Sequence, residues 1–158
     1  MLPYSPLHHL LMHDWQALRP GIPLIMTSGN RTQEPQCIAN DEAVDRLAAI
    51  ADYWLLHDRE IVNRVDDSVA RVDQAGTIRL LRRARGYAPA PMPLPAGFAG
   101  APPLIALGAE LKNTFCLVRD DQFILSQHFG DLEDARGSDA WEQGLDLYRQ
   151  LFGLRPGA

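Results

Sequence analysis

The proline-rich stretch from Ala88 to Pro103 is the feature that most constrains how this chain can fold. It contains six of the chain's 12 prolines, together with glycines and alanines, and no charged residue. Such a composition favours an extended tether over a helix or a sheet. We therefore expect residues 89–103 to link two unequal pieces, residues 1–88 and residues 104–158.

Both pieces are small for free-standing domains, although a hydrophobic content of 46% is enough for a packed core. The second piece is expected to hold three strands and one helix, which leave an open sheet edge with little to cover it. The plainest expectation is therefore that the chain is part of something larger.

Charge and cysteine content narrow the possible function classes. The formal net charge of -5 is unlike that of nucleic-acid-binding proteins, although arginines cluster in residues 79–86. Cys37 and Cys116 have no metal-type spacing with a partner, so neither a zinc site nor a disulfide framework is expected. No apolar run approaches the roughly 20 residues that a membrane span needs. We expect a cytoplasmic protein without membrane contact.

Helix-type and strand-type patterns alternate in the first piece. Apolar residues at spacings of three and four predict an amphipathic helix over residues 6–18, with Pro6 in its first turn. A second helix is expected over residues 41–51, with Asn40 as its N-cap. This order predicts a mixed fold, α/β or α+β. The expected strands are residues 24–27, 53–56, 65–72 and 77–84.

Strand-like runs also dominate the second piece. They are residues 104–110, 113–119 and 122–128, and Asp120-Asp121 is expected to join the last two as a hairpin. A final helix is expected from Ser138. Its apolar stripe would consist of Trp141, Leu145, Tyr148 and Leu151.

The four residues Thr27, Ser28, Gly29 and Asn30 follow directly on an expected buried strand. Their hydroxyls, side-chain amide and bare backbone can approach an anion or a ribose closely. A turn in which Ser28 and Asn30 cap their own backbone explains the same residues. From these residues alone both interpretations remain open.

Residues 57–71, HDREIVNRVDDSVAR, concentrate polar side chains beside a strand pattern. Solvated loop charges are the plain interpretation, because Asp and Arg are common surface residues. Asp67 and Ser68 argue against it, since they lie inside the strand pattern, where Asp is disfavoured. Polar residues placed in this way, with Arg64 nearby, can face a pocket.

The stretch RRARGYAP, residues 82–89, places three arginines before a glycine. Guanidinium groups suit the bidentate binding of phosphate, and strand alternation would send Arg83 and Arg85 to one face. An edge strand kept soluble by its charge would have the same residues, so this alternative stays open.

A hairpin-like stretch, LGAELKNTFCLV, occupies residues 107–118. In a nucleotide-binding hairpin, backbone N–H groups and the side chains of Asn113 and Thr114 can meet phosphates while Lys112 neutralises charge. The pattern alone is weak evidence for that function.

Six segments together resemble the hydrogenase maturation carbamoyltransferases, the HypF family. They are MLPYSPLHHLL, TSGN, HDREIVNRVDDSV, RRARGYAP, LGAELKNTFCL and SQHFGDLED, in the same order and over nearly the whole chain. The resemblance implies that residues 1–88 are the later part of a YrdC-like domain, a twisted sheet with helices. It also implies that residues 104–158 are the first β-hairpin and helix of an actin-like ATPase-fold carbamoyltransferase domain.

The resemblance also implies an activity. In such proteins, carbamate from carbamoyl phosphate is activated with ATP as carbamoyl-adenylate. The carbamoyl group then passes to the C-terminal cysteine of the acceptor protein HypE and becomes the cyanide ligand of nickel-iron hydrogenase. ATP, Mg²⁺, carbamoyl phosphate and a HypE-like acceptor are therefore expected.

Carried over to this chain, the resemblance implies two nucleotide sites and no metal site. A hairpin site would use Lys112, Asn113 and Thr114. No protein nucleophile is implied, because adenylation needs charge stabilisation by preorganised donors rather than a covalent intermediate. The expected residues of the nucleotide and carbamate pocket are Thr27, Ser28, Gly29, Asn30, Arg64, Asp67, Ser68 and Arg85.

Several parts of the family are not matched by these segments. They include the acylphosphatase domain, the zinc-binding region and the first half of the YrdC-like domain. Half a pocket cannot preorganise a transition state, so the 158-residue chain is expected to be inactive by itself.

Two other functions remain open. YrdC-like domains have a basic concave face associated with double-stranded RNA, and the arginines of residues 79–86 support this alternative while the acidic total opposes it. Synthesis of threonylcarbamoyl-AMP is the other alternative. The transferase-like hairpin after residue 103 favours the hydrogenase branch instead.

Overall fold

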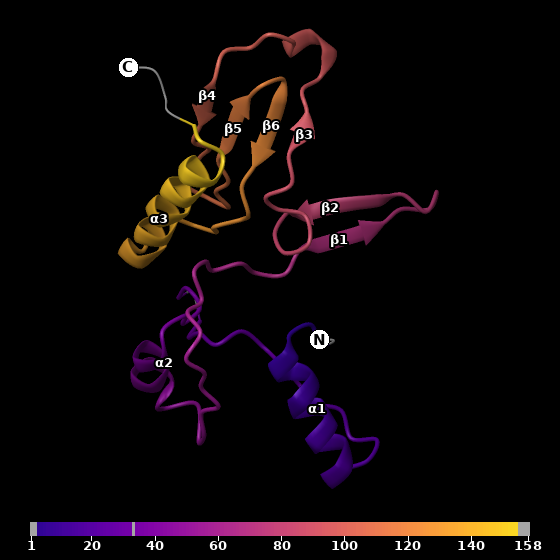
Figure 1. The fold of residues 1–158 in the computed structure, drawn as a ribbon, viewed down its shortest axis with the longest axis vertical. Coiled ribbons are helices and arrows are strands. Elements are labelled where there is room, and N and C mark those ends of the chain that lie inside the picture. Colours follow the sequence, from indigo (N-terminus) through magenta and orange to yellow (C-terminus); the bar gives the residue numbers. More distant parts are fainter. Residues whose placement is uncertain (1–2, 33, 155–158) are drawn as a thin grey trace.

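The computed structural model describes residues 3–32 and 34–154, and its chain combines helices with two antiparallel sheets (Figure 1). The expected mixture of helix and sheet is confirmed. The outermost residues of the two expected pieces, 1–2 and 155–158, lie outside this description. The elements are α1 (Pro6–Leu18), α2 (Asn40–Leu47), β1 (Val69–Val72), β2 (Ile78–Arg82), β3 (Met92–Pro93), the 3₁₀ helix η1 (Ala96–Phe98), β4 (Leu104–Ala106), β5 (Cys116–Arg119), β6 (Gln122–Leu125) and α3 (Ala135–Leu151).

The expected first helix is confirmed with its bounds. Ser5 is the N-cap and its hydroxyl accepts a hydrogen bond from His8 N at 3.2 Å, while Pro6 occupies the first turn, where no N–H is needed. Beyond the other end, the indole Nε1 of Trp15 donates to Ile22 O at 2.7 Å. This bond holds the chain against the helix where it turns back.

The second helix forms where expected but is shorter, and the expectation that Asn40 is its N-cap is wrong. Ala39 is the N-cap, and the side chain of Asn40 donates instead to His57 O at 2.7 Å. Asn40 is therefore the first residue of the helix rather than its N-cap, and its side chain binds a distant segment. The helix ends at Leu47 because Ile50 N and Ala51 N both turn back to Leu47 O.

Two expected strands, residues 24–27 and 53–56, are wrong. A strand needs a neighbour for its main-chain groups, and neither segment pairs with another strand in the part of the chain that the structure describes. Ile25 and Tyr53 are 98% and 93% exposed, whereas Leu24 and Met26 are half-buried. The apolar residues of both segments are typical of strands, but a strand forms only where a neighbouring strand pairs with it.

The expected strands at residues 65–72 and 77–84 form in part, as the two-stranded sheet of β1 and β2. Val72 pairs with Ile78, and the connecting turn is closed by Asp73, whose Oδ1 accepts from Ala75 N and Thr77 N. In Figure 1 this hairpin projects to the side of the molecule. Asp67, before the regular part of β1, makes an isolated bridge with Arg85.

The four-stranded sheet has the order β3-β6-β5-β4. Asp120 and Asp121 form the expected hairpin turn between β5 and β6, and both have positive φ, 51° and 59°. β3 and η1 lie inside the proline-rich stretch, where Met92 pairs with Phe123. That stretch therefore follows the sheet edge for part of its length, and the division of the chain there stays a prediction.

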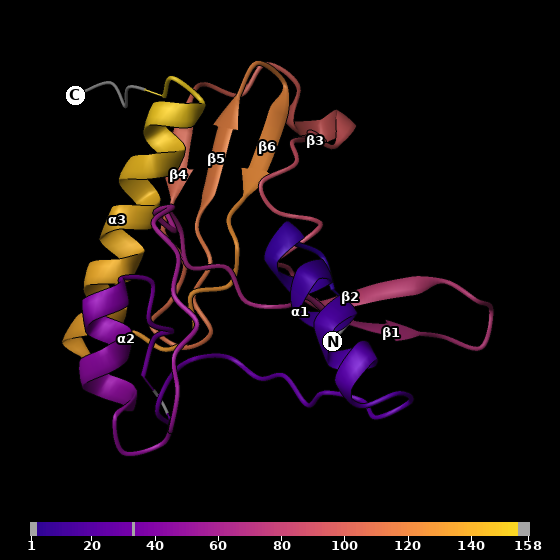
Figure 2. The same cartoon turned by 60° about the horizontal axis from the view of Figure 1, so that its bottom comes forward.

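Helix α3 runs along one face of this sheet (Figures 1 and 2). It begins at Ala135, earlier than expected, because Asp134 caps it by accepting from Arg136 N at 2.7 Å. Of the predicted apolar stripe, Trp141, Leu145 and Tyr148 pack on the core, whereas Leu151 is exposed and Phe152 packs there instead. The buried core cluster consists of Phe115, Leu117, Ile124, Tyr148 and Leu154.

Candidate functional site

A cavity of about 660 Å³ lies in the first piece, between the start of α1 and the segment before β1. It is lined by residues from five separate stretches of the chain. Of the eight residues expected in the nucleotide pocket, six line it: Thr27, Ser28, Gly29, Arg64, Asp67 and Arg85. Segments far apart in the sequence thus meet at one hollow.

A second cavity, of about 450 Å³, lies between the two pieces. Ser28 and Arg64 line both cavities, and Asn30 lines this second one. Its opposite wall comes from the second piece, from His128 to Ala140. Arg64 therefore stands between a hollow formed by the first piece and a hollow shared by both.

Three contacts fix the guanidinium group of Arg85. Its Nη2 donates to Val65 O at 3.0 Å, and its Nε lies 3.6 Å from Asp67 Oδ1. The ring of Tyr4 lies beneath it, with the guanidinium carbon 4.5 Å from the ring centre. Arg85 is thus held in one orientation at the cavity wall.

Arg64 is held from another side. Its Nε donates to Gln36 O at 2.8 Å, and its Nη2 lies 3.6 Å from Glu42 Oε2. Burial by itself would raise the pKa of the Glu42 carboxyl, but a hydrogen bond from Ile38 N and the nearby guanidinium groups of Arg46 and Arg64 outweigh it and lower that pKa. Glu42 therefore stays ionised and keeps Arg64 in place.

Ser68 has a supporting place in this arrangement. Its hydroxyl donates to Arg85 O at 2.9 Å and accepts from Ala84 N at 2.9 Å. The hydroxyl therefore ties the start of β1 to the main chain at Arg85. A direct contact of Ser68 with a nucleotide stays a prediction.

The loop Thr27-Ser28-Gly29-Asn30 combines both interpretations that the sequence left open. Asn30 closes a turn, since its side-chain Nδ2 donates to Arg31 O and Glu34 O at 2.9 and 3.0 Å. Within the described residues no hydrogen bond joins the hydroxyl of Thr27 or Ser28 to another residue, and both residues line the large cavity. Asn30 shapes the loop, and the two hydroxyls remain available to a ligand.

Asn113 in the expected nucleotide hairpin is buried, with 3% exposure. Its Nδ2 donates to Leu107 O and Ala109 O at 3.0 and 2.5 Å, and its Oδ1 accepts from Trp141 Nε1 at 2.7 Å. The side-chain amide thus joins the loop after β4 to helix α3. A nucleotide role for the hairpin stays a prediction.

The same hairpin contains a close approach of main chain to main chain. Gly108 has φ +76°, and a Cβ there would lie 2.3 Å from Thr114 O. Lys112 is exposed, and its N–H donates to Asp131 Oδ1 at 2.7 Å. Lys112 and Thr114 therefore flank the buried Asn113 on a tightly constrained loop.

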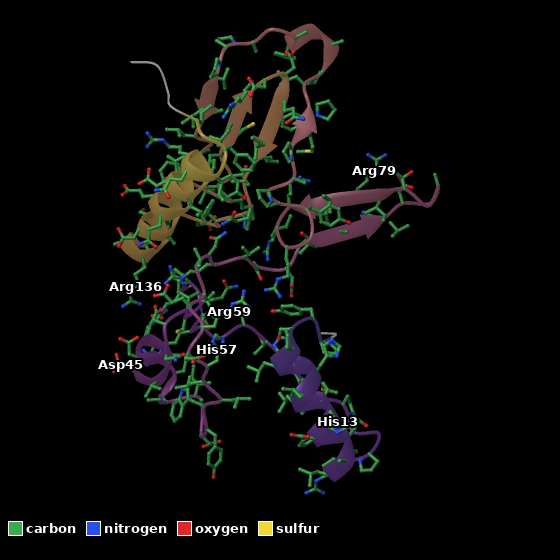
Figure 3. All side chains as sticks on the ribbon, viewed as in Figure 1. His13, Asp45, His57, Arg59, Arg79 and Arg136 are labelled. Carbon is green, nitrogen blue, oxygen red and sulfur yellow. The ribbon has the colours of Figure 1, made fainter. Side chains whose placement is uncertain are left out.

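Sequence patterns missed several residues near the cavities. Tyr4 and His8 line the large cavity, although nothing in MLPYSPLHHLL beyond the family resemblance marks them. Gln127 and His128, which the segment SQHFGDL marks as residues of a turn or a site wall, connect the two pieces through Asn63 and Arg83. Arg136, at the start of α3 and labelled in Figure 3, also connects them, since its Nη1 lies 3.3 Å from Glu34 Oε1. Such contacts depend on tertiary packing and leave no local pattern.

Metal ligands do not gather anywhere in residues 3–32 and 34–154: no three His, Cys, Asp or Glu side chains lie close enough to hold one ion. Cys37 and Cys116 are both free thiols. No described helix is both long and apolar enough to cross a membrane.

Family models match both pieces of the chain. Residues 1–84 match the Sua5/YciO/YrdC model, described as telomere recombination, and residues 99–158 match the model of the HypF Kae1-like domain. The chain is 47% identical over 158 residues to carbamoyltransferase HypF of Rhodobacter capsulatus. The chain belongs to the HypF family. Carbamoyltransferase HypF of Synechocystis is 43% identical over 156 residues.

Solved HypF structures have the same fold. The crystal structure of full-length HypF in the phosphate- and nucleotide-bound form matches 99% of the chain with a TM-score of 0.84 at 42% identity. The crystal structure of T. kodakarensis HypF matches 95% of the chain with a TM-score of 0.80 at 32% identity.

The chain spans only part of these relatives. It covers 20% of the Rhodobacter capsulatus protein, 19% of the Synechocystis protein, and 24% and 18% of the two solved chains.

Proposed function

We propose that this chain supplies one wall of the adenylate-forming pocket of a HypF carbamoyltransferase, together with the beginning of the transferase domain. The observation that carries the proposal is the cavity that unites Ser28, Arg64 and Arg85. The identity of 42% to 47% with proteins named carbamoyltransferase HypF supports the same assignment.

The proposed first reaction joins carbamate to ATP. A carbamate oxygen attacks the α-phosphorus, the bond between that phosphorus and the α,β-bridging oxygen breaks, and pyrophosphate leaves with the negative charge. The fixed guanidinium groups of Arg64 and Arg85 stabilise that charge without reorganising during the reaction. The hydroxyls of Thr27 and Ser28 and the backbone at Gly29 hold the nucleotide and the carbamate.

The proposed second reaction transfers the carbamoyl group to a HypE-like acceptor. The thiolate of the acceptor's C-terminal cysteine attacks the carbamoyl carbon, and AMP leaves. The carbamate derives from carbamoyl phosphate, which another part of the enzyme hydrolyses. Lys112, Asn113 and Thr114 are proposed to belong to a second nucleotide site in the transferase domain.

Mg²⁺ is proposed to accompany the nucleotide. The described residues provide no cluster of three ligands for a resident ion. Phosphate oxygens and water commonly supply most of the ligands of Mg²⁺ in nucleotide sites. No step of the proposed reactions is assigned to a metal held by this chain.

The contacts of the clustered arginines give no separate support to RNA binding. Arg79 pairs with Asp73, Arg82 with Asp66, and Arg85 with Asp67. Arg83 donates to two main-chain carbonyls, those of Tyr87 and Ala90. The RNA alternative stays a prediction.

A chimera tests the proposed function. These 158 residues would replace the matching segment of Rhodobacter capsulatus HypF, which aligns with the whole chain. We expect ATP turnover to AMP that depends on carbamoyl phosphate, and a loss of about 100-fold in Arg85→Ala. The control is Arg79→Ala, on the projecting hairpin in Figure 3, which should keep wild-type turnover. Equal turnover in Arg85→Ala and Arg79→Ala would contradict the proposal.

A further inference from the structure

The segment after β6 contains two buried polar residues in succession, Ser126 and Gln127, and Gln127 is 1% exposed. Its main chain touches both pieces of the protein. Ser126 N donates to Phe115 O within the second piece, and His128 N donates to Arg83 O in the first piece, both at 2.9 Å. The segment therefore lies at the junction of the two pieces.

The side-chain amide of Gln127 bridges the same junction. Its Nε2 donates to Asn63 Oδ1 at 3.0 Å and lies 3.4 Å from Arg64 O. Its Oε1 accepts from the hydroxyl of Tyr148 at 2.6 Å, and that hydroxyl also accepts from Gln127 N at 3.2 Å. Tyr148 thus fixes the amide from the core side, and the amide holds residues 63–64 from the other.

Within the first piece, Gln36 O and Glu42 contact the Arg64 side chain, but these contacts lie in a loosely packed part of the chain. The core cluster consists entirely of residues from the second piece, and no described residue before Ala84 is fully buried. Residues 63 and 64 nevertheless form part of the large cavity wall. Contacts with the better-packed second piece therefore add to those of Gln36 and Glu42 in fixing the main chain at Arg64.

We propose that Gln127 is a positioning residue of the nucleotide pocket: its amide, oriented by Tyr148, holds the Asn63–Arg64 segment so that Arg64 faces the cavity. The part about the nucleotide rests on the proposed function, whereas the positioning of Arg64 does not. Loss of the amide would leave Asn63 Oδ1 without its buried donor, and the segment would move toward water. The second piece would thus determine the geometry of a site in the first.

Solvent exchange of the Arg64 Nε–H, measured by NMR on the ligand-free 158-residue chain, tests the positioning directly. This N–H donates to Gln36 O, and the N–H of exposed Arg79 serves as an internal reference at the same pH. We expect Gln127→Met to raise the Arg64 rate relative to the Arg79 rate about tenfold. The amide of Phe115, bonded to buried Ser126 Oγ, should exchange as in the wild type.

Two more variants separate positioning from general loosening. Gln127→Glu has the same shape, and only its protonated form can donate to Asn63, so the rate ratio should return toward the wild-type value as the pH falls. Asn63→Ala removes the same bond from the other side and leaves the core intact. An unchanged ratio in either folded Gln127→Met or Asn63→Ala overturns the proposal.

The chimera tests the part about the nucleotide. We expect Gln127→Met to raise the KM for ATP about tenfold with a smaller effect on kcat, because Arg64 would be misplaced before binding. An unchanged KM would overturn the nucleotide part even if the exchange ratio changed. A wild-type chimera without any turnover would instead contradict the proposed function, and the exchange ratio would still decide the positioning of Arg64.

Discussion

The guanidinium group of Arg85 lies over the ring of Tyr4, 4.5 Å from the ring centre. The residue before the cap of α1 therefore contacts the third residue after the end of β2. Tyr4 also meets His8 edge to face, with ring centres 4.7 Å apart. The start of α1 therefore contributes directly to the position of an arginine in the candidate pocket.

Replacement of the Tyr4 ring should weaken nucleotide binding. A partly exposed cation–π contact contributes about 0.5–1 kcal/mol, so Tyr4→Leu should raise the KM of the chimera for ATP about twofold to fivefold. Tyr4→Phe keeps the ring and should remain close to wild type. Equal effects of the two substitutions, or none, would contradict a role for the ring.

Helix α3 should tolerate no side chain at Gly144. A Cβ there would lie 2.3 Å from Cζ of Phe129, whose ring stacks on Phe115 and has little room to move. Gly144→Ala should lower the free energy of unfolding by about 1–3 kcal/mol, measured by urea denaturation. Gly97→Ala is the matched control, since nothing lies within 4 Å of its Cβ position. Equal stability of the two variants would show that the packing at α3 is looser than described.

Asn113 should be essential to the second piece as a structural amide. In Asn113→Asp the carboxylate could still accept from Trp141, but the two donors to Leu107 O and Ala109 O would be lost. We expect a loss of stability of at least about 1–3 kcal/mol, because a charge would also be buried. Thermal unfolding measures it, and Lys112→Gln on the exposed side of the loop is the control. Normal stability of Asn113→Asp would contradict a structural role for the Asn113 amide.

The stability of the chain should fall in mild acid because of His128. Burial lowers the pKa of His128 below its ordinary value of 6.5, and the charge of Arg82 lowers it further. The unfolded chain binds the proton more readily than the folded chain does. The contribution of neutral His128 to the free energy of unfolding is therefore complete above pH 6.5 and is lost as the pH falls through the folded-state pKa.

Urea denaturation between pH 7.5 and pH 5 measures the effect, and His128→Gln should flatten that part of the profile. His13→Gln, on exposed α1, should leave it unchanged. An identical profile in His128→Gln would mean that other groups cause the loss.

Local patterns predicted the elements whose partners lie nearby in sequence. Helix α1 forms with its expected bounds, and the β5–β6 hairpin forms with strands shorter than expected, because a cap, a periodic apolar face and a turn fix them locally. The segments around Ile25 and Tyr53 have strand-like residues but no pairing partner within the described chain, and they remain extended. Sequence reasoning identifies an apolar segment more reliably than it identifies what covers it.

The site was predictable to a similar degree. Family motifs identified Ser28, Arg64 and Arg85, which indeed line one cavity. The motif SQHFGDLED contains Gln127 but does not show what its side chain contacts, because an amide that bonds across 64 positions leaves no spacing in the sequence. They place Asn113 in a nucleotide hairpin, which stays a prediction, and they do not reveal its three hydrogen bonds within the protein.

The most direct test of the central claim is the carbamoyl-phosphate-dependent conversion of ATP to AMP by the chimera carrying Ser28→Ala. The Ser28 hydroxyl lines both cavities, so its loss should reduce turnover by about 100-fold while the unfolding midpoint stays at the wild-type value. The isolated 158-residue chain should form no carbamoyl-adenylate. Full turnover in the Ser28→Ala chimera would contradict the assignment of this loop to the nucleotide and carbamate pocket.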